Sequence, residues 1–247
     1  MKRQRQASDK GGGLLRAERL ARYPWLLHAF TTRWSGNLSY GVDAGGAGVG
    51  RNRSRLLKTL VKPQPAPAGR GRFRLVTLRQ RHSDIVRVVD SQLRDVRREP
   101  DGALKLVGDA LITDQVGLLL AVQVADCLPI LLVDPVRRVV ANVHAGWRGT
   151  LARIVEKTVG QMQLRFGSQP RQLVAAIGPG IHRCCYAVGR EVYERYVAQF
   201  AEGEALFRCR EPSPSEVHWN PKVTGRPLKP TADHRRDAGA TSGSSPA

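Results

Sequence analysis

Three short apolar runs in the middle of the chain constrain its fold more than any other feature. They span residues 118–124, 130–133 and 139–143, and Gly, Pro and Asp residues flank them. Runs of this length that are rich in β-branched residues are typical of buried strands rather than helices. Asp134 and Pro135 separate the last two runs by a turn. We therefore expect a core built on buried strands.

Further strands and helices follow from the same kind of pattern. Additional strands are expected to end near Thr32 and to span residues 73–78, 85–89 and 173–177. Helices are expected at 51–61, from an N-cap at Thr150 to about Phe166, and at 191–200, with Gly167 ending the second one. Because hairpin and crossover connections are mixed, we predict an α/β (α+β) layered sandwich, with a mixed β-sheet and flanking helices in a single domain.

The two ends of the chain differ from its middle. Residues 1–13 are basic and end in three glycines, and residues 208–247 are rich in Pro, Ser, Gly and Arg without apolar periodicity. Both segments are expected to be disordered. The catalytic domain is then expected to span residues 14–207, a length that suits one α/β domain.

Charge and composition exclude several classes of protein. The formal net charge of +19 comes mostly from arginines that are spread along the chain, with few aromatic residues among them, so we expect no nucleic-acid partner. No apolar run is long enough to span a membrane, and no apolar segment typical of a secretory signal follows the basic N-terminus. Four cysteines without framework spacing fit a reducing compartment. We predict a cytoplasmic protein.

Three side chains that can bind metal lie at the ends of predicted strands. His82 follows the strand at 73–78, Cys127 follows the run at 118–124, and His144 follows the run at 139–143. Strand ends meet at one edge of a sheet, and imidazole and thiolate are ligands that zinc prefers. Three protein ligands would leave a fourth position open, as in catalytic zinc sites. Spacing alone also permits a hydrogen-bonded histidine and a buried filler cysteine at these positions.

Five local segments occur in one order and are distinctive together. They are Gly108–Thr113, Val124–Ile130, Val143–Gly149, Ile177–Ile181 and Cys185–Gly189. The Ala-Asp-Cys-Leu-Pro and His-Ala-Gly-Trp-Arg-Gly sequences among them are especially specific. Over about residues 25–200 the chain closely resembles the laccase-domain family, also described as multicopper polyphenol oxidoreductases. Members of this family resemble purine nucleoside phosphorylases that also deaminate adenosine and cleave S-methyl-5'-thioadenosine.

The resemblance implies a zinc site and a set of substrates. In the family a His, a Cys and a His hold zinc, and these positions match His82, Cys127 and His144. The residues on either side of His82 depart from the family pattern, since Arg81 replaces Val and Ser83 replaces Gly. The implied partners are phosphate and the purine nucleosides adenosine, inosine, guanosine and S-methyl-5'-thioadenosine. The resemblance stops near residue 207, so the family's C-terminal region is expected to be missing, which puts folding and activity in doubt.

Phosphorolysis and deamination indicate roles for several further residues. Arg33 and Arg148 are candidates for binding phosphate, because a guanidinium grips phosphate through two hydrogen bonds. Gly146 opens a segment whose backbone N–H groups, at the expected start of a helix, could add to that binding. Asp126 is a candidate general base or hydrogen-bond partner of a ligand histidine, and could equally cap a strand end.

Other hypotheses stay open beside the zinc enzyme. A copper oxidase with several copper sites would need many more histidines than the six present. A metal-free hydrolase could use Cys127 as nucleophile and His144 as base. The chain could also be inactive, or a basic protein that binds RNA. Cys184, Cys185 and His182 could form a second metal site, although packing near the Gly-Pro-Gly loop is the simpler role.

Overall fold

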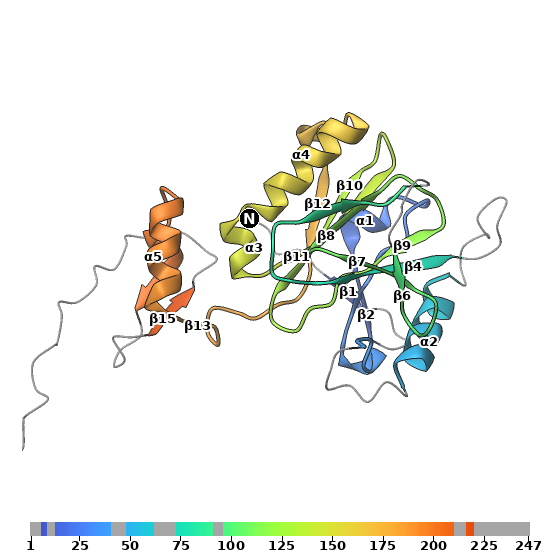
Figure 1. Ribbon diagram of the computed structural model, residues 1–247, viewed down its shortest axis with the longest axis horizontal. Coiled ribbons are helices and arrows are strands. Elements are labelled where there is room, and N and C mark those ends of the chain that lie inside the picture. The colour runs from blue at the N-terminus through green and yellow to red at the C-terminus, as the bar shows by residue number, and fades with distance from the viewer. Residues whose placement is uncertain are drawn as a thin grey trace, which may run out of the picture. The chain divides into compact units, whose positions relative to one another are not determined.

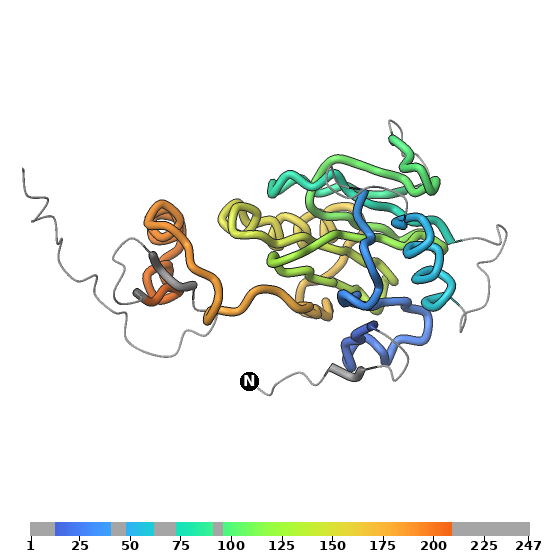
Figure 2. Tube along the Cα trace, turned by 90° about the horizontal axis from the view of Figure 1, so that it is seen from below, coloured from blue at the N-terminus to red at the C-terminus, as the bar shows by residue number. Residues whose placement is uncertain are grey.

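The computed structural model describes residues 6–8, 13–40, 48–61, 73–90, 96–209 and 216–219 (Figure 1, and Figure 2 from a second direction). They group into two compact units, Met1–Ile181 and His182–Ala247, each described by itself below. Two short strands, β1 (Gln6–Ser8) and β15 (Glu216–Trp219), and the last two residues of β14 (Phe207–Cys209) fall within the end segments for which we predicted disorder. Most of the remainder of those segments lies outside the described residues, so the predicted boundaries at residues 13 and 207 stay predictions.

A five-stranded mixed sheet is the main element of the first unit. Its strands, in spatial order, are β12 (Val174–Ile177), β10 (Leu128–Asp134), β11 (Val139–Ala145), β8 (Ala110–Thr113) and β5 (Val86–Val88). The β5–β8 pair is parallel, and the other three pairs are antiparallel. The sheet is therefore mixed, as the sequence predicted.

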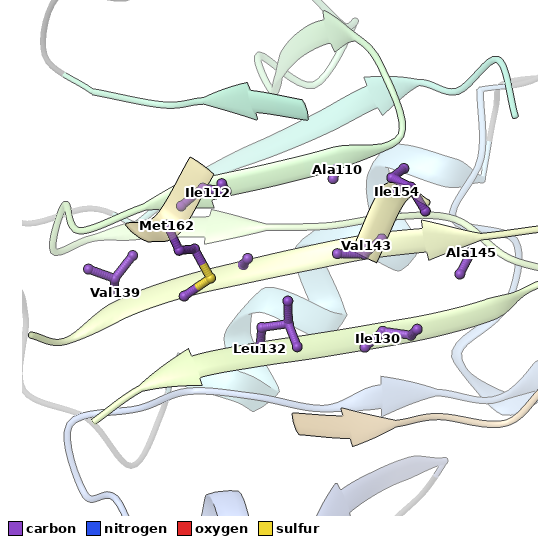
Figure 3. Close-up of a cluster of buried hydrophobic side chains, with 10 residues drawn as sticks. Ala110, Ile112, Ile130, Leu132, Val139, Val143, Ala145, Ile154 and Met162 are labelled. Carbon is purple, nitrogen blue, oxygen red and sulfur yellow. The ribbon is translucent and has the colours of Figure 1, made fainter. Parts of the chain in front are cut away.

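The β10–β11 hairpin explains the continuous apolar runs in the sequence. In β10, Ile130 and Leu132 face a cluster that includes Ile154 and Met162, whereas Val133 belongs to a second cluster on the opposite face. Figure 3 shows the first cluster between the strands of the sheet and the helix that carries Ile154 and Met162. A strand that is buried on both faces has no polar alternation. The predicted turn is also present, because the Asp134 carboxylate accepts hydrogen bonds from the backbone N–H groups of Val136 and Arg137.

The helical segment after β11 consists of two helices rather than the one predicted. The first is α3 (Trp147–Leu151), and the second is α4 (Ile154–Phe166). Thr150 therefore lies inside α3 and does not cap the longer helix. Arg153 has a left-handed backbone conformation with φ of 61°, and this residue separates the two helices. Gly167 ends α4 in a left-handed conformation, as predicted.

A second sheet has four strands. Its spatial order is β6 (Arg97–Arg98), β7 (Leu104–Val107), β4 (Arg74–Arg79) and β9 (Leu118–Leu120). The predicted strand at 118–124 is shorter than expected because side-chain hydrogen bonds take up the backbone groups of Gln123. The Gln80 side chain accepts from Gln123 N and donates to Gln123 O, both at 2.7 Å.

The N-terminal part of the first unit contains a small sheet and short helices. The sheet consists of β1, β2 (Leu14–Ala17) and β3 (Phe30–Thr31), and β3 ends where the sequence predicted a strand end near Thr32. The helical segments are α1 (Glu18–Ala21), η1 (Arg33–Ser35), α2 (Val49–Val61) and, later in the chain, η2 (Pro170–Gln172). Helix α2 coincides closely with the predicted helix at 51–61.

The described residues of the second unit form one α-helix, one short 3-10 helix and three short strands. These elements are β13 (Ala187–Gly189), α5 (Arg190–Gln199), η3 (Glu204–Leu206), β14 (Phe207–Cys209) and β15. Tyr196 of α5 is buried and packs edge-on against Phe207, with ring centroids 5.6 Å apart. The predicted helix at 191–200 is confirmed, and the mixed α/β class holds for the described residues. No helix among them is both long and apolar enough to cross a membrane.

A buried ion-pair network links α2 to the four-stranded sheet. Arg53 lies 2.5 Å from Glu99 and 3.2 Å from Asp101, and Lys105 lies 2.7 Å from Glu99. The Thr77 hydroxyl also donates to Glu99. Burial alone would raise the pKa of Glu99, but the hydrogen bonds from Lys105, Arg53 and Thr77 and the charge of Arg53 hold it below the ordinary value. Folding therefore favours the ionised carboxylate.

Glu99→Gln is expected to lower the free energy of unfolding at neutral pH by about 3 kcal/mol, because it leaves two cations without their main partner. Since folding lowers the pKa of Glu99, its contribution is complete above the ordinary value of 4.5 and is lost as the pH falls through the folded pKa. Urea unfolding should thus show the difference between wild type and variant shrinking as the pH drops below about 4.5. Glu156→Gln, at an exposed ion pair, is the control and should change stability by under about 0.5 kcal/mol. A difference that does not vary with pH would contradict this account.

Candidate metal centre

Three side chains from distant parts of the first unit converge at one place. One potential ligand atom from each of His82, Cys127 and His144 lies within 4.8 Å of the others. Within the described part of the chain, this is the one group of three or more His, Cys, Asp or Glu side chains with such a spacing. His82 is exposed, Cys127 is half-buried and His144 is 3% exposed. The group therefore has a buried base and a side that solvent can reach.

The β10–β11 hairpin brings two of these residues together. His144 pairs with Pro129 in the antiparallel register, and Cys127 lies directly before the first residue of β10. The two side chains are thus neighbours across the open end of the hairpin. This proximity follows from local pairing, since only the turn at Asp134 has to form.

His82 reaches the same place through the Gln80–Gln123 contact. Gln80 follows the end of β4, and its amide group holds the backbone of Gln123, which lies four residues before Cys127. This pair of hydrogen bonds fixes the loop that carries His82 beside the segment that carries Cys127. The rings of His82 and His144 then meet edge to face, with centroids 4.8 Å apart.

Asp109 is the residue that holds the two histidines in place. Its carboxylate is fully buried, accepts hydrogen bonds from the backbone N–H groups of Arg81, His82 and Ser83, and lies 2.8 Å from His144 Nδ1. The Ser83 hydroxyl also donates to it. Burial would raise the pKa of Asp109, but these hydrogen bonds outweigh it and lower the pKa. An ionised Asp109 leaves Nε2 as the ring nitrogen of His144 that is available to a metal.

The backbone of His82 is strained and stabilised at the same point. His82 has a φ of 55°, which is uncommon for a residue other than glycine. Its N–H donates to Asp109 at 3.0 Å, and its two neighbours donate to the same carboxylate. Gly108, next to Asp109, has a φ of 152°, and a Cβ there would meet Ile85 O at 2.8 Å. Strain of this kind is retained where the surroundings over-determine a functional geometry.

Gly146 leaves the space that the cluster needs. A Cβ at this position would lie 2.9 Å from Cys127 Sγ and 3.1 Å from His82 Cδ2. The backbone of Gly146 therefore lies so close to two of the three side chains that only a glycine fits at this position. Two imidazoles and one thiol around such a recess fit the donor set of an open zinc site.

Burial and the nearby carboxylates of Asp126 and Asp109 raise the pKa of Cys127. In His144, burial lowers the pKa, and the hydrogen bond and charge of Asp109 oppose that effect while His82 adds to it. A metal ion would have to displace the thiol proton, as ligand thiols require. Without one, a thiol of raised pKa is a poor nucleophile, which argues against the metal-free hydrolase.

The other predicted site residues lie near this cluster with different partners. Asp126 is exposed, and its backbone carbonyl accepts from Ile181, whereas the carboxylate that contacts His144 belongs to Asp109. Arg148 is exposed in α3 and stacks over the Trp147 ring at 4.5 Å. Because α3 has only five residues, its N-terminus offers little of the expected dipole. The roles of Asp126, Arg148 and Gly146 stay predictions.

A cavity of about 570 Å³ lies in the first unit, and Arg33 is part of its lining. Leu56, Leu57 and Leu60 of α2 line it, as does the segment at 121–125 that leads to Cys127. The three potential ligands are not part of this lining. The volume lies in the range of small-molecule pockets. Sequence reasoning did not identify this cavity, because its walls come from several segments that are far apart in the sequence.

Gly146→Ala is expected to weaken metal binding by at least about tenfold while the protein stays folded, because the added methyl group displaces Cys127 or His82. Zinc affinity by competition with a chromophoric chelator measures the effect. The matched control is Gly160→Ala in α4, where a Cβ meets no atom within 4 Å. This control should raise stability by about 0.5–1 kcal/mol and leave zinc affinity unchanged. Equal affinities in all three proteins would contradict the importance of this recess.

Asp109→Asn is expected to lower zinc affinity by about 10- to 100-fold, because the His144 ring loses the carboxylate that orients it. Asp134→Asn is the matched control, since Asp134 is also fully buried and also accepts backbone N–H groups, at the β10–β11 turn. Both variants should lose stability in thermal unfolding, but only Asp109→Asn should lose zinc affinity. Equal losses of zinc affinity would mean that Asp109 acts only on the fold.

Known proteins resemble this chain in sequence and in structure. The family model described as multi-copper polyphenol oxidoreductase laccase matches residues 28–223, so the match continues past Phe207, where the resemblance was expected to stop. The structure is similar to that of YlmD from Geobacillus stearothermophilus, with a TM-score of 0.69, 30% identity, and 86% of this chain and 78% of that chain covered.

Two curated relatives are named as enzymes of purine nucleosides. One, adenosine deaminase RL5 of an unknown prokaryotic organism, is 39% identical over 62% of this chain and 57% of its own length. The other, a purine nucleoside phosphorylase of Clostridium acetobutylicum, is 40% identical over 54% of this chain and 50% of its own length. The chain thus spans about half the length of these relatives. With its family match over residues 28–223, the chain belongs to the multi-copper polyphenol oxidoreductase laccase family.

Proposed function

We propose that this chain is a zinc-dependent purine nucleoside phosphorylase that also deaminates adenosine. The observation that carries the proposal is the convergence of His82, Cys127 and His144 within 4.8 Å around the recess at Gly146. The names of the two curated relatives support the choice of purine nucleosides as substrates. Inosine, guanosine and S-methyl-5'-thioadenosine are further proposed substrates, and the cytoplasm is the proposed location.

The donor set favours zinc over copper. Blue-copper sites use two histidines, a cysteine and a weak axial methionine. The chain has two methionines. Met162 is fully buried in the hydrophobic core between α4 and the sheet, and its neighbours there do not include the three potential metal ligands. Two neutral imidazoles and one thiolate with an open fourth position match catalytic zinc. Bound zinc would supply Lewis-acid chemistry for a water or a developing negative charge.

The remaining chemistry falls to residues of the chain. Asp109 fixes the His144 ring, so that the same nitrogen always faces the metal position. We assign phosphate binding to Arg148, in the short helix that begins just after Gly146, and to Arg33, which lines the 570 Å³ cavity. Asp126 is exposed and is our candidate for moving a proton between substrate and solvent.

Purified protein incubated with adenosine and phosphate should produce adenine and ribose 1-phosphate, and should produce inosine when phosphate is left out. Elemental analysis should find about one zinc per chain in the wild type. Cys127→Ser and His144→Ala should lose most of the zinc and at least about 100-fold in turnover, because each removes a ligand. Cys184→Ser is the matched cysteine control and should keep both.

Several outcomes would contradict the proposal or redirect it. Turnover by a zinc-free Cys127→Ser protein would exclude the metal mechanism. Trapping of wild-type Cys127 by a substrate-like electrophile would favour the metal-free hydrolase. Salt-sensitive RNA binding that survives His82→Ala, without any nucleoside turnover, would favour the basic RNA-binding protein.

A further inference from the structure

Two adjacent cysteines in the second unit lie outside the proposed reaction. Cys184 and Cys185 are both exposed, and their sulfur atoms are 3.2 Å apart. They lie in a turn that is closed by hydrogen bonds from Cys185 N and Tyr186 N to the carbonyl of His182. Adjacent side chains in a strand would point to opposite faces. The turn therefore places both thiols on the same side.

The adjacency of the two cysteines favours a dithiol over a disulfide. Consecutive Cα atoms are about 3.8 Å apart, whereas disulfides usually join Cα atoms about 4.4–6.8 Å apart. A bond between Cys184 and Cys185 would be strained and easily reduced. The hydrogen bond with Cys184 also raises the pKa of the Cys185 thiol, which keeps this thiol protonated and less prone to oxidation.

The spacing of the two sulfur atoms selects the kind of ion that they could hold. A linear two-coordinate ion would need the sulfurs about 4.6 Å apart, given metal–sulfur bonds of about 2.3 Å. The observed 3.2 Å instead fits a bent arrangement around one atom. Among the described residues, no third His, Cys, Asp or Glu ligand completes a metal-type cluster here, so a tetrahedral zinc ion lacks protein ligands.

We propose that Cys184 and Cys185 form a chelating site for trivalent arsenic. This ion is soft, binds thiolates in a bent geometry, and brings its own third substituent. Arsenous acid would react with the two thiols to form two As–S bonds, and its two displaced hydroxyl groups would leave with the thiol protons as two waters. Arsenic keeps the +3 oxidation state, so the step needs no oxidant or reductant.

Phenylarsine oxide is the probe for this site, because it forms two As–S bonds with a dithiol and releases one water. Intact-mass measurement of the full chain should show one phenylarsine adduct in the wild type. Trypsin cuts after Arg183 and Arg190, so the adduct should be found on the peptide 184–190, which contains both cysteines. An excess of 2-mercaptoethanol should leave the adduct in place, whereas a dithiol such as 2,3-dimercaptopropanol should remove it.

Variants separate this site from the metal centre. Cys184→Ser and Cys185→Ser should each weaken binding of the probe by at least about 100-fold, because chelation is lost. Cys127→Ser should keep the adduct, and thermal unfolding should show that all variants are folded. No adduct on the wild type, or an adduct that persists in both Cys184→Ser and Cys185→Ser, would overturn the proposal. Nucleoside turnover is measured separately, so failure of one proposal is distinguishable from failure of the other.

Discussion

The buried carboxylate of Asp109 is the interaction on which the candidate centre depends. It accepts three consecutive backbone N–H groups from the loop at 81–83 and contacts the ring of His144 on the neighbouring strand. Such a carboxylate is costly to bury unless each of its oxygens is hydrogen-bonded, and here they are. One side chain therefore sets the backbone of His82 and the orientation of His144 together. A change at this position affects both potential ligands at once.

The rest of the assembly divides between local and long-range constraints. The β10–β11 hairpin places Cys127 beside His144 through pairing that involves only one turn. The approach of His82 instead needs the Gln80–Gln123 contact, which joins the segments that follow the two strands of the parallel β4–β9 pair. Parallel pairing requires a long connection, so this half of the centre forms only when the five-stranded and the four-stranded sheet have both formed. The proximity of Cys127 and His144 thus depends on one hairpin, whereas the position of His82 depends on the whole fold.

The same division explains what the sequence could predict. The strands β10 and β11, helix α2 and the end of α4 at Gly167 were predictable, because apolar runs and turn residues are local signals. The strands β6 and β7 were missed because they are short and carry charged residues such as Arg97 and Lys105. The break between α3 and α4 at Arg153 was not predictable, because arginine is not a residue type that typically interrupts helices. The three potential ligands are predictable mainly through family resemblance. The role of Asp109 has no local signal in the sequence, since its partners are 26 to 35 residues away.

The candidate centre lies in the same unit as the other residues that we propose for the reaction. His82, Cys127, His144 and Asp109 all belong to the first unit, as do the cavity and both arginines that we propose for phosphate. In the part of the chain that the structure describes, the hydrogen bonds that position His82 and His144 join residues of the first unit, and Ile181 N–H donates to the carbonyl of Asp126, directly before Cys127. The relatives named as enzymes are about twice as long as the part of them that this chain matches. A metal bound by these side chains would therefore be held by the first unit, and the residues around it would select the reaction.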